Sequence, residues 1–319
     1  MIKNTSAPKL KSPIMLCAWP GMGEVAIKAA LYLKDSLPFK EFGRIEAGNY
    51  FEAAGIFVKG GVLELPKPMG GVFYYYKNPG KPNDIILFIS DAQPNLGSGI
   101  SYAREIIDFA LKHGVKFIYT FAAMTVPIEH TQTSNVWIAV TAKKVMQQFK
   151  GVNLKTLNDG QISGLNGLIL GVAKNKGLNG ACLLGEIPIY TIQIENPKAS
   201  LAVLDVLAKT LGLTLDCKGL LERAKFVDEE INKLIGYIKG EPSHTGPLSE
   251  DEIERIKKEL AAFTRLPNSA REKIEALFKL AAEDLNKAAE LKKELDTWSV
   301  FKDYEDRFLD LFRRSKPNQ

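Results

Sequence analysis

The sequence predicts a layered α/β domain with a mixed sheet, followed by an all-helical C-terminal tail. Residues 14 to about 238 alternate apolar, β-rich runs with helical patterns, as α/β domains do. The strongest run, Asp84 to Ser90, is almost continuously apolar, which is typical of a strand buried on both faces of a sheet. A Pro/Gly-rich stretch, Gly240 to Pro247, then separates this region from one with helical spacing.

The N-terminal elements follow from the same patterns. A strand is expected at Ile14–Ala18 and a helix at Glu24–Ser36, joined by a loop that contains two glycines. Short strands are expected near residues 43–46, 61–65 and 72–76. Because turn-forming residues lie between the last two, an antiparallel hairpin is possible there, and the sheet would then be mixed.

The rest of the domain continues this alternation. The expected elements are a helix at 98–113, strands at 117–121 and 136–140, helices at 142–149 and 165–174, strands at 181–185 and 189–192, a helix at 198–211 and a last helix at 217–239.

We place three segments along the chain: an α/β domain at 1–240, a linker at 241–248 and a helical C-terminal extension at 249–319. In the extension, Ser249–Glu252 and Ser269–Glu272 both match the capping box of a helix N-terminus.

An apolar stripe at three–four spacing runs through the extension, from Ile274 to Trp298 and on to Phe312. A lone amphipathic helix is not stable in water. The stripe must therefore cover the α/β domain, pack into a helical hairpin or pair with another subunit, and packing within the protein is favoured.

Composition narrows the function classes. The 42 basic and 37 acidic residues are spread along the chain without a basic run, which argues against nucleic acid as a partner. No apolar stretch approaches the roughly 20 residues of a membrane span, and the N-terminus lacks a signal-peptide core, so no membrane partner and a cytoplasmic location are expected. Cys17, Cys182 and Cys217 are expected as buried reduced thiols. The three histidines lack metal-ligand spacing, so no metal is expected.

One local pattern resembles a dinucleotide-binding loop. Gly21-Met-Gly23-Glu-Val-Ala26 fits G-x-G-x-x-G/A, with an acidic residue, Glu46, roughly 20 positions downstream. Against this, Trp19-Pro20 lengthens the loop and Glu24 places a negative charge at the first helical turn. A tight strand-to-helix turn is therefore the favoured interpretation, and no cofactor is expected.

Polar residues follow several predicted strands. Parallel strands deliver their carboxyl ends to one edge of the sheet, so these residues predict a ligand crevice there. The candidates are Trp19, Gly21, Gly23, Glu24, Asp91, Gln93, Gly164, Asn166 and Glu186. Three of them, Glu24, Asp91 and Glu186, would form an acid–base set if they converged, whereas capping and loop hydrogen bonding is the competing role. No nucleophile motif is present, so catalytic residues stay unassigned.

Three segments carry a family resemblance. The Trp19–Gly23 loop, the run Gly160–Leu170, and Leu183–Pro188 followed by Pro197 and a helix together resemble the proteasome assembly chaperone 2 family over roughly residues 10 to 240. The resemblance identifies a prokaryotic member with a C-terminal helical extension. It implies a phosphorylase/hydrolase-like α/β/α fold, similar in outline to purine nucleoside phosphorylase, in a family that includes chaperones of proteasome ring assembly.

The family's chaperones dock through a C-terminal hydrophobic–tyrosine–any tripeptide, whereas the last residues here are Pro317-Asn-Gln319. This departure puts proteasome subunits in doubt as partners. We therefore expect a non-enzymatic protein-binding or assembly-chaperone-like factor that forms a homo-oligomer. The alternatives are a small-molecule or nucleotide-binding enzyme that uses the strand-end crevice, and a scaffold whose tail alone mediates assembly.

Overall fold

The computed structural model describes residues 2–4, 8–46, 50–51, 56–65, 69–95, 97–238, 268–297 and 300–313. The chain divides into two compact units, Met1–Leu221 and Glu222–Gln319. The expected linker at 241–248 and the Ser249–Glu252 capping box lie outside the described residues. The boundary at residue 240 stays a prediction.

The first unit is built on a nine-stranded mixed sheet in the order β1-β3-β6-β7-β2-β8-β11-β9-β10. The strands are β1 (Ile2–Asn4), β2 (Ile14–Ala18), β3 (Lys40–Glu46), β6 (Gly70–Tyr76), β7 (Ile85–Ser90), β8 (Phe117–Val126), β9 (Val136–Val140), β10 (Lys155–Thr156) and β11 (Asn179–Pro188). The four central strands, β7, β2, β8 and β11, are mutually parallel. Antiparallel neighbours, β6 on one side and β9 on the other, flank them. The mixed sheet predicted from the sequence is confirmed.

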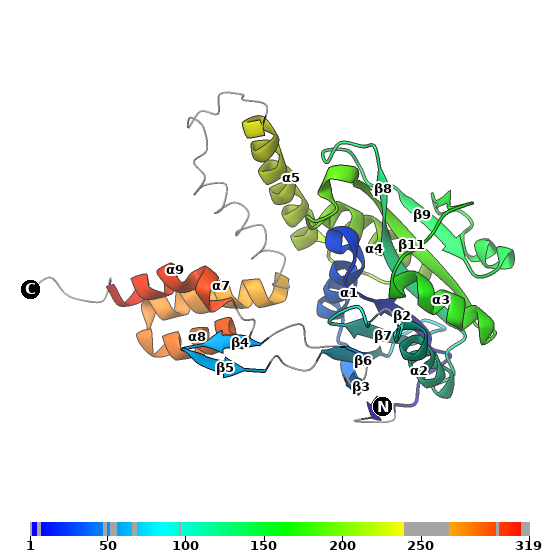
Figure 1. The fold of residues 1–319 in the computed structure, drawn as a ribbon, viewed down its shortest axis with the longest axis horizontal. Coiled ribbons are helices and arrows are strands. Elements are labelled where there is room, and N and C mark those ends of the chain that lie inside the picture. The colour runs from blue at the N-terminus through cyan, green and yellow to red at the C-terminus, as the bar shows by residue number, and fades with distance from the viewer. Residues whose placement is uncertain are drawn as a thin grey trace, which may run out of the picture. The chain divides into compact units, whose positions relative to one another are not determined.

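Helices cover both faces of this sheet (Figure 1). On one face, α1 (Val25–Ser36) and α4 (Pro197–Leu211) pack over one apolar core. On the other, α2 (Gly99–Lys112) and α3 (Leu165–Asn175) pack over a second core. Alternate residues of the central strands feed the two cores, since a strand buried on both faces must be apolar throughout. The predicted α/β/α layers are confirmed.

The centre of the sheet holds two of the three cysteines. Cys17 in β2 and Cys182 in β11 both lie opposite Thr120 in the intervening strand β8. Both thiols are buried, as expected, whereas Cys217 is only half-buried. Burial raises the pKa of Cys17 well above its ordinary value and the pKa of Cys182 to about 12.

Three sequence predictions are wrong in this unit. The strand near 61–65 does not pair with β6: as β5 (Val62–Glu64) it pairs with β4 (Phe57–Lys59), because the positive φ angles of the glycines between them close a tight turn. The segment 189–192 forms the 3₁₀ helix η3 (Ile189–Thr191) instead of a strand, since the chain leaves the sheet at Pro188. The helix at 142–149 is also 3₁₀, η2 (Lys143–Phe149).

The described part of the second unit begins within α5 (Lys218–Ile238) and continues with α7 (Asn268–Glu283), the 3₁₀ turn η4 (Leu285–Lys287), α8 (Ala288–Thr297) and α9 (Phe301–Arg313). The stripe predicted as one helix is broken between α7 and α8, so the helices fold back on one another. Their shared core comprises Ile274, Leu277, Phe278, Ala281, Ala288, Leu291, Leu295, Val300 and Phe308. Of the open alternatives, the stripe thus packs within a helical bundle. None of the described helices has the length and apolar character that a membrane crossing requires.

Candidate ligand pocket at the carboxyl edge of the sheet

A pocket of about 940 Å³ opens beside the carboxyl ends of the central strands. Parallel strands direct the loops that follow them to this edge, where α/β folds form ligand crevices. The described lining comes from residues 20–22, 26, 93–95, 99, 122–125, 157 and 159–168, together with Leu184. Four of the nine predicted site residues belong to it: Gly21, Gln93, Gly164 and Asn166.

Asn166 joins the first turn of α3 to the loop after β2. Its Oδ1 accepts the backbone N–H of Trp19 at 3.1 Å, and its Nδ2 donates to the Trp19 carbonyl at 3.2 Å. The Asn166 side chain is buried, and Trp19 is fully buried against Phe88. A primary amide can both donate and accept a hydrogen bond, so Asn166 satisfies both backbone groups of Trp19, the residue that follows β2.

Gln93 makes a second brace of the same kind. Its Oε1 accepts the backbone N–H of Leu165 at 2.9 Å, which caps the N-terminus of α3, and its Nε2 donates to the Pro20 carbonyl at 2.7 Å. Gly164 precedes the helix with a φ of 71°, and a Cβ there would approach Gln93 Nε2 to 3.0 Å. Gln93 and Asn166 thus fix the wall of the pocket.

Gly23 and Glu24, which the dinucleotide interpretation would use, are not part of the described lining. The Gly23 N–H donates to the Ile192 carbonyl at 2.8 Å, and the Gly23 carbonyl accepts the Asn196 N–H at 2.9 Å. Glu24 adopts a left-handed φ of 52° and lies 3.4 Å from Lys28. The turn is therefore fastened to the loop after β11, and the Gly23 N–H already has an acceptor.

Glu186 lies in β11 directly opposite Met124 of β8, and its carboxylate joins neighbouring strands of the sheet. Its carboxylate accepts hydrogen bonds from Lys155 Nζ at 2.7 Å, Trp137 Nε1 at 2.8 Å and Asn135 Nδ2 at 2.7 Å. The side chain is buried. Burial raises the pKa of Glu186, but these hydrogen bonds outweigh burial and leave the pKa below its ordinary value. Glu186 therefore stays ionised as a tie between β11, β9 and β10.

Asp91 follows β7 and remains exposed. Its backbone N–H donates to the Gly70 carbonyl at 2.9 Å, and partial desolvation raises the pKa of its carboxyl group. Within the described structure, Glu24, Asp91 and Glu186 each have separate local surroundings. Their membership of one crevice, and a joint acid–base role, stay predictions.

The pocket carries less negative charge than the nine predicted site residues would give it, because Glu24, Asp91 and Glu186 are not in its described lining. Within its described lining, Asp159 is the one charged side chain, while Asn95, Thr125, Gln161 and Ser163 supply neutral polar groups. Such a lining suits a neutral or cationic polar ligand better than a phosphate. The sequence analysis missed Asp159, whose position just before the Gly160–Gly164 loop was the available signal.

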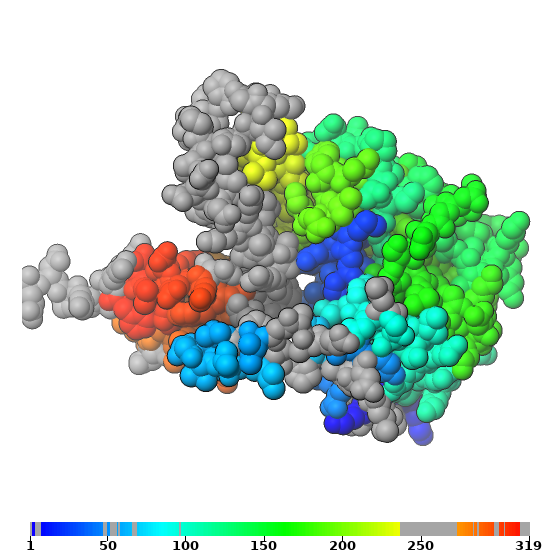
Figure 2. Space-filling view, in the orientation of Figure 1, coloured from blue at the N-terminus to red at the C-terminus, as the bar shows by residue number. Residues whose placement is uncertain are grey.

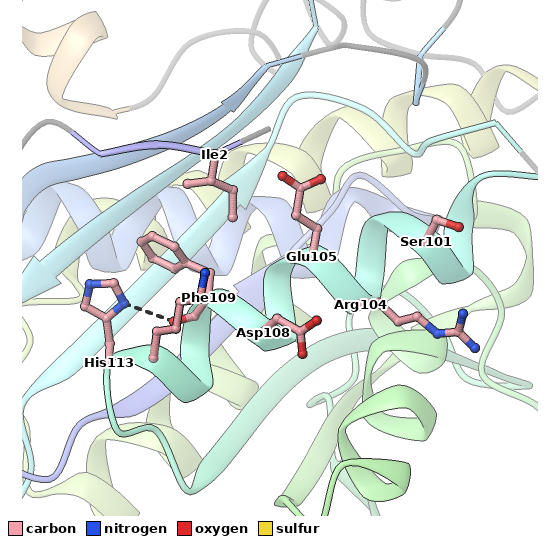
Figure 3. A pocket seen from close by; sticks show the side chains of 8 residues that line it. Ile2, Ser101, Arg104, Glu105, Asp108, Phe109 and His113 are labelled. Carbon is pink, nitrogen blue, oxygen red and sulfur yellow. Dashed lines mark hydrogen bonds between the residues drawn. The ribbon is translucent and has the colours of Figure 1, made fainter.

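A second pocket, of about 680 Å³, lies along the outer side of α2 (Figure 3). The labelled side chains come from α2 and its end, with Ile2 of β1 facing them. Its acidic groups already have partners: Asp108 accepts from Lys176 Nζ at 2.9 Å, and Glu105 accepts from the Tyr50 hydroxyl at 2.7 Å. His113 Nδ1 contacts the Phe109 carbonyl at 2.9 Å. Because these groups are engaged, the strand-edge pocket is the better candidate site.

The chain is similar in sequence to one protein family and to a protein from an archaeon. The model of the PAC2 family matches residues 15–235. An uncharacterized protein of Methanocaldococcus jannaschii is 28% identical over 251 residues, which cover 77% of this chain and 93% of that protein.

Solved structures extend the comparison. Pyrococcus furiosus PbaB, an archaeal proteasome activator, is 29% identical with a TM-score of 0.64, and the match covers 73% of this chain and 98% of PbaB. Pyrococcus furiosus PbaA, an archaeal homolog of proteasome-assembly chaperone, is 24% identical with a TM-score of 0.57 over 75% of this chain and 93% of PbaA. At that identity the likeness to PbaA shows a shared fold.

Proposed function

The chain belongs to the PAC2 family, and from this membership we propose that it is a non-enzymatic, assembly-chaperone-like factor that binds protein partners. Proteasome subunits are the first partner to test. The observation that carries this proposal is the likeness to PbaB, a proteasome activator, because it extends over 98% of that chain at 29% identity.

The chemistry of the strand-edge pocket supports binding over catalysis. Acid–base catalysis needs a proton donor and acceptor placed around the reacting atoms, and phosphate recognition favours Lys or Arg. The described lining offers Asp159 with neutral amides and hydroxyls. Glu186, the most tightly held carboxylate near this edge, has its oxygens committed to Lys155, Trp137 and Asn135.

The test is reconstitution with a purified archaeal proteasome core particle. The intact chain and the core particle are mixed and separated by size-exclusion chromatography, and hydrolysis of a fluorogenic peptide is followed in parallel. We expect comigration and a change in hydrolysis rate. If the two species elute independently and hydrolysis is unchanged, the proteasome is not the partner.

A second candidate function is small-molecule binding in the strand-edge pocket, which the volume of about 940 Å³ favours. Thermal-shift screening of neutral and cationic polar metabolites addresses it. A saturable stabilisation that Asp159→Asn weakens, while the chain still folds, would place the ligand in this pocket. Turnover of that ligand would favour the enzyme alternative.

A further inference from the structure

The amino edge of the central strands, opposite the strand-edge pocket, gathers lysines from distant parts of the sequence. The parallel strands β7, β2, β8 and β11 begin at this edge, and the antiparallel strands β6 and β9 end there. Figure 2 shows how segments far apart in the sequence, coloured turquoise and green, adjoin on the surface of this unit. The loops at this edge therefore form one continuous part of the surface.

Two of these lysines lie beside β6, β7 and β2. The Asp84 N–H, just before β7, donates to the Lys11 carbonyl at 3.0 Å, which places Lys11 at the edge. Lys77 directly follows β6, whose last residue lies opposite the first residue of β7. Both lysine side chains are exposed.

Three more lysines continue the edge across β8, β11 and β9. Lys116 precedes β8, and its carbonyl accepts the Asn179 N–H at the start of β11 at 3.3 Å. β9 ends beside the start of β11, and Lys143 and Lys144 follow it as the first residues of η2. All three lysine side chains are exposed. We call Lys11, Lys77, Lys116, Lys143 and Lys144 the lysine edge.

The charge of the lysine edge is not neutralised locally. Within the described structure, its five ammonium groups form no ion pair. Nearby carboxylates are engaged elsewhere: buried Asp84 accepts two backbone N–H groups, and Asp108 accepts from Lys176 Nζ at 2.9 Å. Lys112 and Lys174 also lie near this edge, but they complement the C-terminal dipoles of α2 and α3 and are left out of the set.

This concentration of charge is produced by the fold. The five residues come from four separate segments, so the sequence contains no basic run there. The expectation that nucleic acid is not a partner was based on that missing run. At the opposite, carboxyl edge, Asp91 and Asp159 are exposed. The first unit thus has edges of opposite charge, which would orient an approaching polyanion toward the lysines.

We propose that the lysine edge binds double-stranded nucleic acid through its phosphate backbone, without regard to base sequence. An ammonium group is a compact point charge with three donors, which suits phosphate oxygens without requiring a fixed geometry. Protein interfaces, by contrast, are depleted in lysine and depend on aromatic and arginine anchors. The lysine edge contains neither type of anchor, so phosphates are favoured over an acidic protein.

The aromatic residues next to the lysines favour a duplex over a single strand. Single strands are held by rings on which their bases stack. Phe117, beside Lys116, is buried, and Tyr76, beside Lys77, is half-buried against Phe39 with ring centroids 5.6 Å apart. Neither ring is open for stacking. A duplex keeps its bases stacked internally and presents only phosphates to such a surface.

The length of the edge suits a short stretch of duplex. Five strand intervals separate β6 from β9 in the sheet, which is about 24 Å at the usual spacing of roughly 4.8 Å. A duplex rises about 3.4 Å per base pair, so the edge covers roughly seven base pairs. Five phosphate contacts over this length make affinity depend steeply on salt.

The test is fluorescence anisotropy with the intact chain and two labelled DNA duplexes of about 20 base pairs and unrelated sequence. The edge variant combines Lys77→Glu, Lys116→Glu and Lys144→Glu. These positions avoid the last turns of α2 and α3, and circular dichroism checks the fold.

The control variant combines Lys225→Glu, Lys279→Glu and Lys302→Glu, at exposed positions of the second unit. Both sets lower the net charge of +5 equally. A difference between the two variants therefore reports the position of the charges and not their number.

We expect the parent and control to bind both duplexes with a Kd of about 1–100 μM at physiological salt, and a fourfold rise in salt to weaken binding at least about a hundredfold. The edge variant should bind at least about tenfold more weakly. A parent that does not bind, or equal losses in the two variants, overturns the proposal. If poly-L-glutamate competes as well as unlabelled duplex at equal charge concentration, the edge takes acidic protein and the proposal is wrong.

Lysine acetylation followed by mass spectrometry covers the case in which the edge variant misfolds, because it uses the parent chain. Bound duplex should protect Lys77, Lys116 and Lys144 from the reagent and leave Lys225 and Lys279 reactive. Uniform protection, or none, contradicts the proposed surface. Neither experiment contains a proteasome, so this proposal and the proposed function fail separately.

Discussion

The side-chain amide of Asn166 forms two hydrogen bonds with the backbone of Trp19 across 147 residues of sequence, at 3.1 Å and 3.2 Å. Both partners are buried. The contact holds the loop after β2 against the first turn of α3, and both segments line the strand-edge pocket.

Asn166→Ala should lower the free energy of unfolding by about 2–4 kcal/mol, because it leaves a buried N–H and a buried carbonyl of Trp19 without partners. Chemical denaturation measures the change. Gln161→Ala, at an exposed position of the same pocket, is the control and should stay within about 0.5 kcal/mol of the parent. Equal effects of the two substitutions would show that Asn166 is not a brace.

Gly164→Ala should destabilise the chain by about 1–2 kcal/mol, because the φ of 71° is unfavourable for a residue with a Cβ and because that Cβ would press on Gln93. The matched control is Gly171→Ala in α3, where a Cβ would meet nothing within 4 Å. That substitution should stabilise by about 0.5–1 kcal/mol. In thermal melts, the expected result is that Gly164→Ala lowers the melting temperature and Gly171→Ala raises it.

Glu186 should make stability depend on pH. Its folded pKa lies below the ordinary value of 4.5, so its contribution is complete above pH 4.5 and is lost as the pH falls through the folded pKa. Glu186→Gln should cost about 2–4 kcal/mol at neutral pH, because it leaves a buried hydrogen-bond network unbalanced, and it should flatten the acid limb of the stability curve. Denaturation from about pH 7 to pH 3 measures both effects. An unchanged acid limb would mean that other carboxylates dominate it.

NAD and ATP should give no saturable signal below about millimolar concentration, a limit of roughly −4 kcal/mol. The Gly23 N–H already donates to Ile192, and Asp159 repels phosphates that enter the pocket. Isothermal titration measures binding. Micromolar binding that Gly23→Val abolishes would favour the dinucleotide interpretation instead.

Residues 1–240 should fold without the extension, because the nine-stranded sheet and its two cores lie before it, and the bundle of α7, α8 and α9 has a core of its own. A single cooperative thermal transition of the truncated chain is the expected result. A soluble product that melts without cooperativity would mean that the extension completes the first domain.

The sequence predicted the central strands correctly because strands buried on both faces leave continuous apolar runs, such as Ile85–Ser90. It failed at the hairpin because Val58 and Leu63 carry the same residue types as a buried strand while being exposed. An apolar pattern indicates which side chains favour burial, but it does not indicate which part of the protein packs against them. The pairing of β4 with β5 therefore could not be separated from a pairing with β6.

The sequence also predicted only part of the candidate site, because it does not show which distant segments come into contact. Residues after strand ends were collected at one edge, and Gln93 and Asn166 do line the pocket. Their roles as braces depend on which backbone atoms lie within reach, such as the Pro20 carbonyl, and sequence spacing does not contain this information. The break in the tail stripe between α7 and α8 was equally hidden, because η4 keeps the apolar spacing while it reverses the chain.

The row formed by Cys17, Thr120 and Cys182 makes the chain suitable for site-selective labelling. Two cysteines on strands separated by a third are roughly 9–10 Å apart, too far for a disulfide, and their raised pKa values keep both thiols protonated and unreactive. Cys217 alone is partly accessible among the three. After Cys217→Ser, a fluorophore or spin label attached to an introduced cysteine would report from a single position.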